Sequence, residues 1–303
     1  MERRVTPFFQ RPDRETEITQ LRPRLRKGLA TPASTDAEFG INEDARRLVR
    51  SPVFIFSAFR SGSTLLRCIL DTHSCVHSPP EMHLDGMNVR ISGRSAKDAV
   101  PAMGMIRQDL DNLLWDALLY RSLVRSGKKI LVEKTPDNVR MWRRISTHWP
   151  EARYIFLLRN PLNILDSMRN WRGRPSRLGR IGARLCGYHW MKEQYLHHWL
   201  LPLLTDLAEA RASLPGITIR YEQLTTDPHG TMQAVCKHLD IPWEPQMLNY
   251  GRVPHGAFGL RLGDTSERIR SGRILADRSQ EPLKEIAKFR RISAILGYPS
   301  QRC

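Results

Sequence analysis

Five consecutive residues, from Arg60 to Thr64, have the properties needed to bind an anion. They read Arg-Ser-Gly-Ser-Thr. The guanidinium of Arg60 offers a planar fork of charged donors, and the hydroxyls of Ser61, Ser63 and Thr64 can each donate a hydrogen bond. Gly62 has no Cβ, so the backbone there can approach a ligand closely. The stretch therefore predicts an anion site.

The residues on either side of this stretch predict a strand followed by a helix. The run 53–59, VFIFSAF, is short, apolar and rich in β-forming residues, which is typical of a buried strand. Apolar residues between Leu65 and Leu70 then recur at helical spacing, with Ser61 or Ser63 as the expected N-cap. Unpaired N–H groups and the positive end of the dipole at such a helix start attract an anion.

Two common phosphate-binding patterns are missing from the sequence. There is no GxxxxGK[ST] motif with its lysine, so a nucleotide-dependent, kinase-like phosphotransferase is the less favoured alternative. There is also no GxGxxG motif, which argues against a dinucleotide-binding fold.

The rest of the chain alternates between strand and helix patterns. Further strands are predicted at 75–78, 128–134, 153–159 and 216–224, and helices at 36–49, 103–126, 139–149, 183–212 and 229–239, with another helix beginning at Pro161. Asn160 and Pro161 are the expected cap and first residue of the helix after the 153–159 strand. This alternation predicts an α/β three-layer sandwich with a mostly parallel central sheet, in which ligands bind at the carboxyl ends of the strands. We expect residues 51–303 to form one domain, preceded by a polar N-terminal arm, 1–50.

The chain of 303 residues is strongly basic, with 48 Lys+Arg against 31 Asp+Glu and a net charge of +17. The excess is concentrated inside the chain at 138–192 and near its end at 252–303. A hydrophobic content of 41% excludes a disordered polyelectrolyte. Because the densest basic block overlaps strand and helix patterns, a basic pocket is favoured, and a basic nucleic-acid-binding protein is the non-enzyme alternative.

The five cysteines include no CxxC pair and no Cys/His set with metal-ligand spacing, so we expect reduced thiols and no metal site. No apolar run is long enough to span a bilayer, and the first residues have no apolar segment like that of a secretory signal. We therefore expect a cytoplasmic protein without a membrane partner.

Two separate motifs resemble those of the PAPS-dependent sulfotransferases (PAPS is 3′-phosphoadenosine 5′-phosphosulfate). FRSGSTLLR, 59–67, resembles the P-loop-like 5′-phosphosulfate-binding loop of that family. RYIFLLRNPLNILDSM, 153–168, resembles the second signature, in which an arginine ends a strand and a serine follows in the next helix. The resemblance continues through 132–138, 220–228 and 238–245. It covers roughly 52–250 and is closest to tyrosylprotein and bacterial small-molecule sulfotransferases.

The resemblance implies a site for PAPS as sulfo donor. The loop amides, with Ser63 and Thr64, would hold the 5′-phosphosulfate, and Arg60 would neutralise charge on the bridging oxygen. Arg159 and Ser167 would bind the 3′-phosphate. The full set implied for the donor is Arg60, Ser61, Gly62, Ser63, Thr64, Leu65, Arg159, Ser167, Tyr221, Arg268, Arg270 and Arg273.

The resemblance also implies a catalytic group of Glu81, His83, Lys134 and Arg60. Glu81 is favoured as the general base that deprotonates the acceptor, with His83 as the alternative. Lys134 would stabilise the sulfo group or the acceptor, unless it forms an ion pair with a neighbouring carboxylate of its own segment.

The expected acceptor is a hydroxyl of a small molecule or natural product, and the sequence does not say which. The variable loops of the protein that would bind the acceptor are expected at 84–105 and 172–182. We expect no nucleic-acid partner, and an assembly of identical subunits is compatible with the sequence.

Overall fold

The computed structural model describes residues 47–169, 188–257, 259, 262–276 and 286–298, with the side chains of 188–195 left out. Most of the predicted arm, the predicted acceptor loop at 172–182, and the start of the helix predicted from residue 183 lie outside these ranges. Nearly all of the short helix predicted at 36–49 also lies outside the described ranges.

A parallel sheet forms the middle layer of the described chain. Its five strands run in the order β2-β3-β1-β4-β5, and every neighbouring pair is parallel. The strands are β1 (Val53–Ser57), β2 (Val76–His77), β3 (Ile130–Glu133), β4 (Arg153–Leu158) and β5 (Gly216–Arg220). The predicted α/β fold with a mostly parallel sheet is therefore confirmed.

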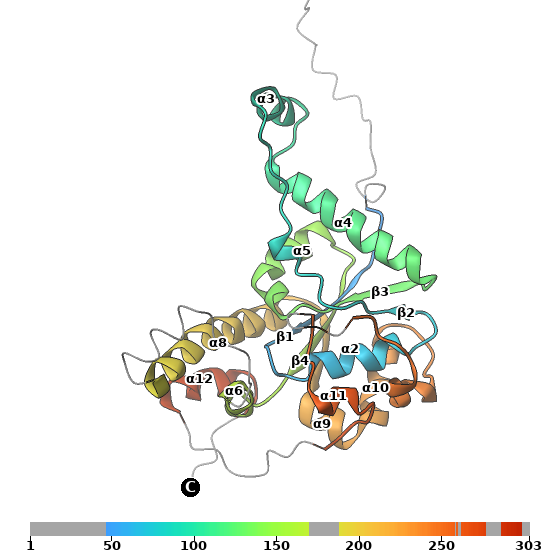
Figure 1. The fold of residues 1–303 in the computed structure, drawn as a ribbon, viewed down its shortest axis with the longest axis vertical. Coiled ribbons are helices and arrows are strands. Elements are labelled where there is room, and N and C mark those ends of the chain that lie inside the picture. The colour runs from blue at the N-terminus through green and yellow to red at the C-terminus, as the bar shows by residue number, and fades with distance from the viewer. Residues whose placement is uncertain (1–46, 170–187, 258, 260–261, 277–285, 299–303) are drawn as a thin grey trace, which may run out of the picture. The chain divides into compact units, whose positions relative to one another are not determined.

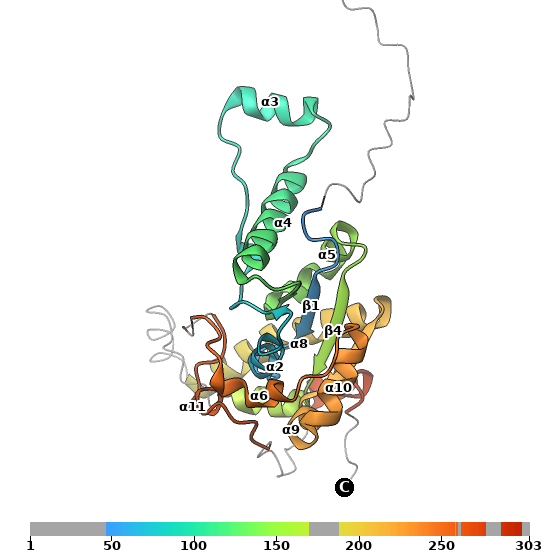
Figure 2. The ribbon, with the colours of Figure 1, turned by 90° about the vertical axis from the view of Figure 1, so that its right-hand side faces the viewer.

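Helices cover both faces of this sheet, with α8 and α12 on one side and α2 and α10 on the other (Figure 1). The longer helices are α2 (Ser63–Asp71), α3 (Arg94–Ala102), α4 (Arg107–Ser126), α5 (Trp142–His148), α6 (Pro161–Arg169), α8 (Tyr188–Ser213), α10 (Pro228–His238) and α12 (Ala287–Ile295). Shorter helical segments are η2 (Leu84–Gly86), η3 (Pro136–Met141), α9 (Tyr221–Thr226), η4 (Pro245–Arg252) and α11 (Glu267–Arg270). Figure 2 shows α3 and the start of α4 standing away from the sheet.

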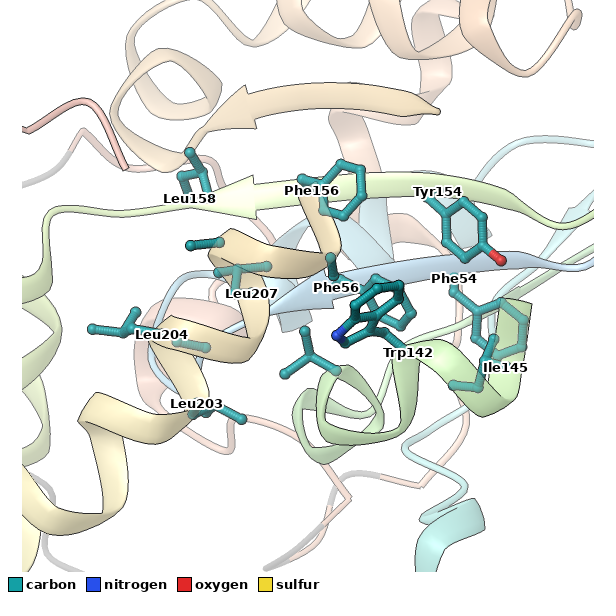
Figure 3. Close-up of a cluster of buried hydrophobic side chains, with 14 of the residues drawn as sticks. Phe54, Phe56, Trp142, Ile145, Tyr154, Phe156, Leu158, Leu203, Leu204 and Leu207 are labelled. Carbon is teal, nitrogen blue, oxygen red and sulfur yellow. The ribbon is translucent and has the colours of Figure 1, made fainter. Parts of the chain in front are cut away.

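The side chains of β1 and β4 alternate between two hydrophobic clusters, because successive residues of a strand point to opposite faces. Phe54, Phe56 and Phe156 join the cluster under α5 and α8, which also contains Trp142, and their rings pack with that of Tyr154 (Figure 3). The intervening residues of both strands join the second cluster, under α2 and α10. Strands buried on both faces explain why their sequences read as unbroken apolar runs.

Three local expectations were wrong. The N-cap of α2 is Gly62 in a left-handed conformation (φ 86°), where a serine side chain was expected to cap. The strand predicted to reach residue 224 ends at Arg220, and α9 begins at Tyr221. The helix predicted at 139–149 is divided, with a 3-10 segment as far as Met141 and α5 after it.

None of the helices in the described ranges combines the length and hydropathy needed to cross a membrane.

Helix α4 offers a matched test of the packing. Leu119 is fully buried against the sheet domain, whereas Leu113 on the same helix is 46% exposed. Leu119→Ala should lower the free energy of unfolding by about 2–5 kcal/mol, because it removes buried methyl groups and leaves a cavity. Leu113→Ala should change it by less than about 0.5 kcal/mol. Urea unfolding curves measure both, and similar losses would contradict this packing of α4.

Candidate active site

The parallel sheet brings five separate segments to one edge. Because all five strands run the same way, the residues that follow them share the carboxyl edge of the sheet. These are the loop 58–62 after β1, Glu81 after β2, Lys134 after β3, Arg159 after β4 and Tyr221 after β5.

The loop after β1 turns sharply into α2. Arg60 and Gly62 both have positive φ, 63° and 86°, in the left-handed region. This turn leads into the first turn of α2, whose N–H groups lack partners within the helix. The Ser61 hydroxyl is fully buried and has no hydrogen-bond partner in the described part of the chain. A buried hydroxyl of this kind is able to donate a hydrogen bond to a bound ligand.

Gly62 allows the loop to contact the end of β5. A Cβ at Gly62 would overlap the Tyr221 ring. The guanidinium carbon of Arg159 lies 4.5 Å from the centre of the same ring. An Arg159 Nη also donates to the Arg60 carbonyl, at 2.8 Å. The two predicted signatures are thus held together through the loop backbone and Tyr221.

Arg60 also contacts Asp264, a residue that was not predicted as part of the site. Its Nε donates to Ser167 Oγ at 3.2 Å, and its Nη1 lies 3.1 Å from a carboxylate oxygen of Asp264. The Asp264 amide donates to Thr64 Oγ1 at 2.9 Å. Asp264 lies four residues before Arg268, the first of the C-terminal arginines predicted for the donor, and nothing in the sequence indicated its contact with Arg60.

These residues surround a pocket of about 220 Å³. Its wall contains Arg60, Gly62, Leu65, Arg159, Ser167, Tyr221, Tyr250, Asp264, Ser266, Arg268, Ile269, Arg273 and Leu275. Eight of these belong to the set predicted for the donor. Ser61, Ser63 and Thr64 are buried within the adjoining loop and helix start, and Arg270 is exposed and outside the wall.

Glu81, His83 and Lys134 form a second group beside the anion loop. Lys134 is fully buried and forms an ion pair with Glu81, so its carboxylate partner comes from another segment. Its Nζ also lies 3.5 Å from Thr64 Oγ1, and His83 Nε2 lies 3.5 Å from the second Glu81 oxygen. Burial lowers the pKa of Lys134, and the charge of Glu81 opposes that shift.

Glu133 binds the backbone of the segment that contains Glu81 and His83. Its buried carboxyl accepts from the Met82 amide at 3.2 Å and from the Thr135 hydroxyl at 2.6 Å. Burial raises the pKa of Glu133, while the hydrogen bonds from Thr135 and Met82 counter this. The Thr135 hydroxyl in turn accepts from the His83 amide at 3.1 Å.

Within the described ranges, no three His, Cys, Asp or Glu side chains gather in a way that could hold a metal ion.

The fold and this pocket define an α/β protein with a P-loop-like strand-loop-helix at the carboxyl edge of its sheet. The model of a sulfotransferase family matches residues 52–245. The chain therefore belongs to the sulfotransferase family.

Individual proteins agree with this assignment. The chain is 32% identical to nodulation protein NoeE of Sinorhizobium fredii, over 71% of this chain and 55% of that protein. It is 22% identical to protein-tyrosine sulfotransferase A of Caenorhabditis elegans, over 66% and 53%. The chain thus spans just over half the length of these curated relatives. A sulfotransferase domain from the curacin biosynthetic pathway has the same fold, with a TM-score of 0.55 at 20% identity over 84% of this chain and 99% of that one.

Gly62 provides a test of the contact with Tyr221. A Cβ in a left-handed conformation is expected to lower the free energy of unfolding by about 1–2 kcal/mol. Gly62→Ala should lower it by clearly more, because the new methyl group also overlaps the Tyr221 ring. Gly104→Ala is the matched control, since Gly104 also has positive φ (71°) but open space around it. Equal losses in urea unfolding would show that the overlap with Tyr221 does not occur.

Proposed function

We propose that the protein transfers the sulfo group of PAPS to a hydroxyl of a small-molecule or natural-product acceptor. The observation that carries this proposal is that residues from both signatures line one pocket together with Arg268 and Arg273. Four arginines and one aspartate line that wall within the described residues. Such a basic wall complements a donor that has phosphate groups on both its 3′ and 5′ sides.

The anion loop suits the 5′-phosphosulfate end of this donor. The α2 amides and the buried, unpartnered Ser61 hydroxyl supply donors at the helix start. Thr64 Oγ1 accepts from the Asp264 amide, which leaves its own hydrogen available for a ligand oxygen. We assign Arg159 and Ser167 to the 3′-phosphate, and Arg268 and Arg273 to the wall closing over it.

The catalytic step we propose is an in-line displacement. The acceptor oxygen bonds to sulfur as the bond from sulfur to the 5′-phosphate oxygen breaks, and Glu81 takes the acceptor proton. Lys134 lies between Glu81 and Thr64, where its charge can stabilise the sulfo oxygens. Arg60 at the pocket wall would neutralise charge on the leaving phosphate. His83 lies beside the same carboxylate and is the alternative base.

The donor assignment predicts binding of adenosine 3′,5′-bisphosphate without magnesium. Arg159→Ala should weaken this binding about 10- to 100-fold, the effect of losing a hydrogen bond to a charged group. Arg143→Ala is the control: Arg143 is 71% exposed, pairs with Glu209 on the surface and should leave affinity unchanged. Isothermal titration calorimetry measures both. Failure of the folded wild-type protein to bind would refute the donor assignment.

The catalytic assignment predicts that Glu81→Gln spares bisphosphate binding but lowers kcat about 10²- to 10⁴-fold. Glutamine can still accept a hydrogen bond from Lys134, and thermal unfolding checks that the variant is folded. His83→Gln should retain most of the rate. The opposite ranking would make His83 the base.

Labelled PAPS, offered with a panel of small hydroxyl compounds and with a tyrosine-containing peptide, tests the acceptor. The peptide belongs in the panel because some relatives are protein-tyrosine sulfotransferases. Transfer to the peptide alone would overturn the small-molecule assignment.

A further inference from the structure

One part of the pocket wall, residues 266–275, is far in sequence from the anion loop. The side chain of a buried tyrosine, Tyr250, contacts the backbone of this segment. Tyr250, at the end of η4, is 2% exposed. Its hydroxyl lies 3.1 Å from the Arg273 carbonyl and 3.3 Å from the Ile269 carbonyl. Burial raises the pKa of Tyr250 to about 12, so the hydroxyl remains a donor at neutral pH. These two carbonyls belong to the backbone that carries the pocket arginines.

The neighbouring glycines bring the same two segments into backbone contact. A Cβ at Gly251 would lie 2.5 Å from Gly272 Cα. The end of η4 therefore packs directly on the turn that precedes Arg273, and a side chain at Gly251 would push that turn away.

His255 connects Tyr250 to the far end of α2. Its Nε2 lies 2.6 Å from the Tyr250 carbonyl, and its Nδ1 lies 2.9 Å from an Asp71 carboxylate oxygen. Both partners are acceptors at neutral pH, so the ring satisfies both when each nitrogen carries a hydrogen. His255 is 5% exposed. Its own carbonyl accepts from the buried Arg67 at 3.2 Å.

Asp71 is the α2 residue at which this series of contacts ends, and several groups bind its carboxylate. Burial by itself would raise its pKa, but hydrogen bonds from His255, His77 and the Ser78 amide, with the charge of Lys128, hold the pKa well below its usual range. Asp71 is also the last residue of α2, the helix that begins at the anion loop.

We propose that Asp71, His255 and Tyr250 are positioning residues for the sulfo donor. They connect the last turn of α2 to the backbone that carries Arg268 and Arg273, and so hold the two sides of the pocket at a fixed spacing. This inference rests on the proposed function and adds to it the contacts that position Arg268 and Arg273.

The test is a double-mutant cycle on the affinity for adenosine 3′,5′-bisphosphate. Tyr250→Phe removes only the hydroxyl and should raise Kd about 3- to 10-fold, as for the loss of one hydrogen bond. In the Arg268→Ala/Arg273→Ala background, the same change should have almost no further effect, because the groups that it positions are gone. Calorimetry at high protein concentration keeps the weaker binding measurable.

A second measurement separates positioning from general stability. In turnover assays, Tyr250→Phe should raise KM for PAPS and leave KM for the acceptor unchanged. Tyr154→Phe is the matched control, since Tyr154 is equally buried but lies in the aromatic cluster on the other face of the sheet. It should alter neither constant. Gly251→Ala and His255→Gln should weaken bisphosphate binding in the same direction as Tyr250→Phe.

The outcomes are distinguishable. If the wild-type protein does not bind the bisphosphate, the proposed function fails and this inference fails with it. If it binds, but Tyr250→Phe has no effect or the same effect in both backgrounds, only the positioning role is refuted.

Discussion

The close approach of Gly62 to the Tyr221 ring is the contact on which the site depends. It is possible because residue 62 has no Cβ and takes a left-handed conformation that glycine adopts without strain. The contact sets the anion loop of β1 against the end of β5. Arg159, which follows the strand between them in the sheet order, lies over the same ring. Three strand ends thereby become one wall of the pocket.

Buried charge holds the remaining parts in place. Lys134 is fully buried and ion-paired with Glu81, and two charged side chains of α2, Arg67 and Asp71, are also buried. Breaking one member of such a pair leaves an uncompensated charge in the interior, so these groups constrain their neighbours strongly. The excess of positive charge along the chain is thus partly accounted for. Arg159, Arg268 and Arg273 face the pocket, whereas the arginines at 172–184 lie outside the described residues.

Much of the fold could be predicted because it depends on local patterns. The runs at 53–59 and 153–159 are apolar since β1 and β4 are buried on both faces, and such runs are visible in a sequence. Local patterns failed where tertiary contacts decide the backbone. The N-cap of α2 is Gly62 and not the predicted serine, because the loop passes close to the Tyr221 ring. No feature of the sequence near residue 62 indicates a contact with a ring 159 positions away.

The amino-acid sequence by itself determined the fold class, the order of strands and helices, and the two signature motifs, because each of these depends on a short, continuous segment. The tertiary structure alone decided that Glu81 pairs with Lys134, that Asp264 contacts Arg60, and that Arg273 but not Arg270 faces the pocket. The physical reason is that these contacts join segments distant in the chain. Their geometry depends on parallel strands sharing one edge and on how the interior is packed, which spacing in a sequence does not record.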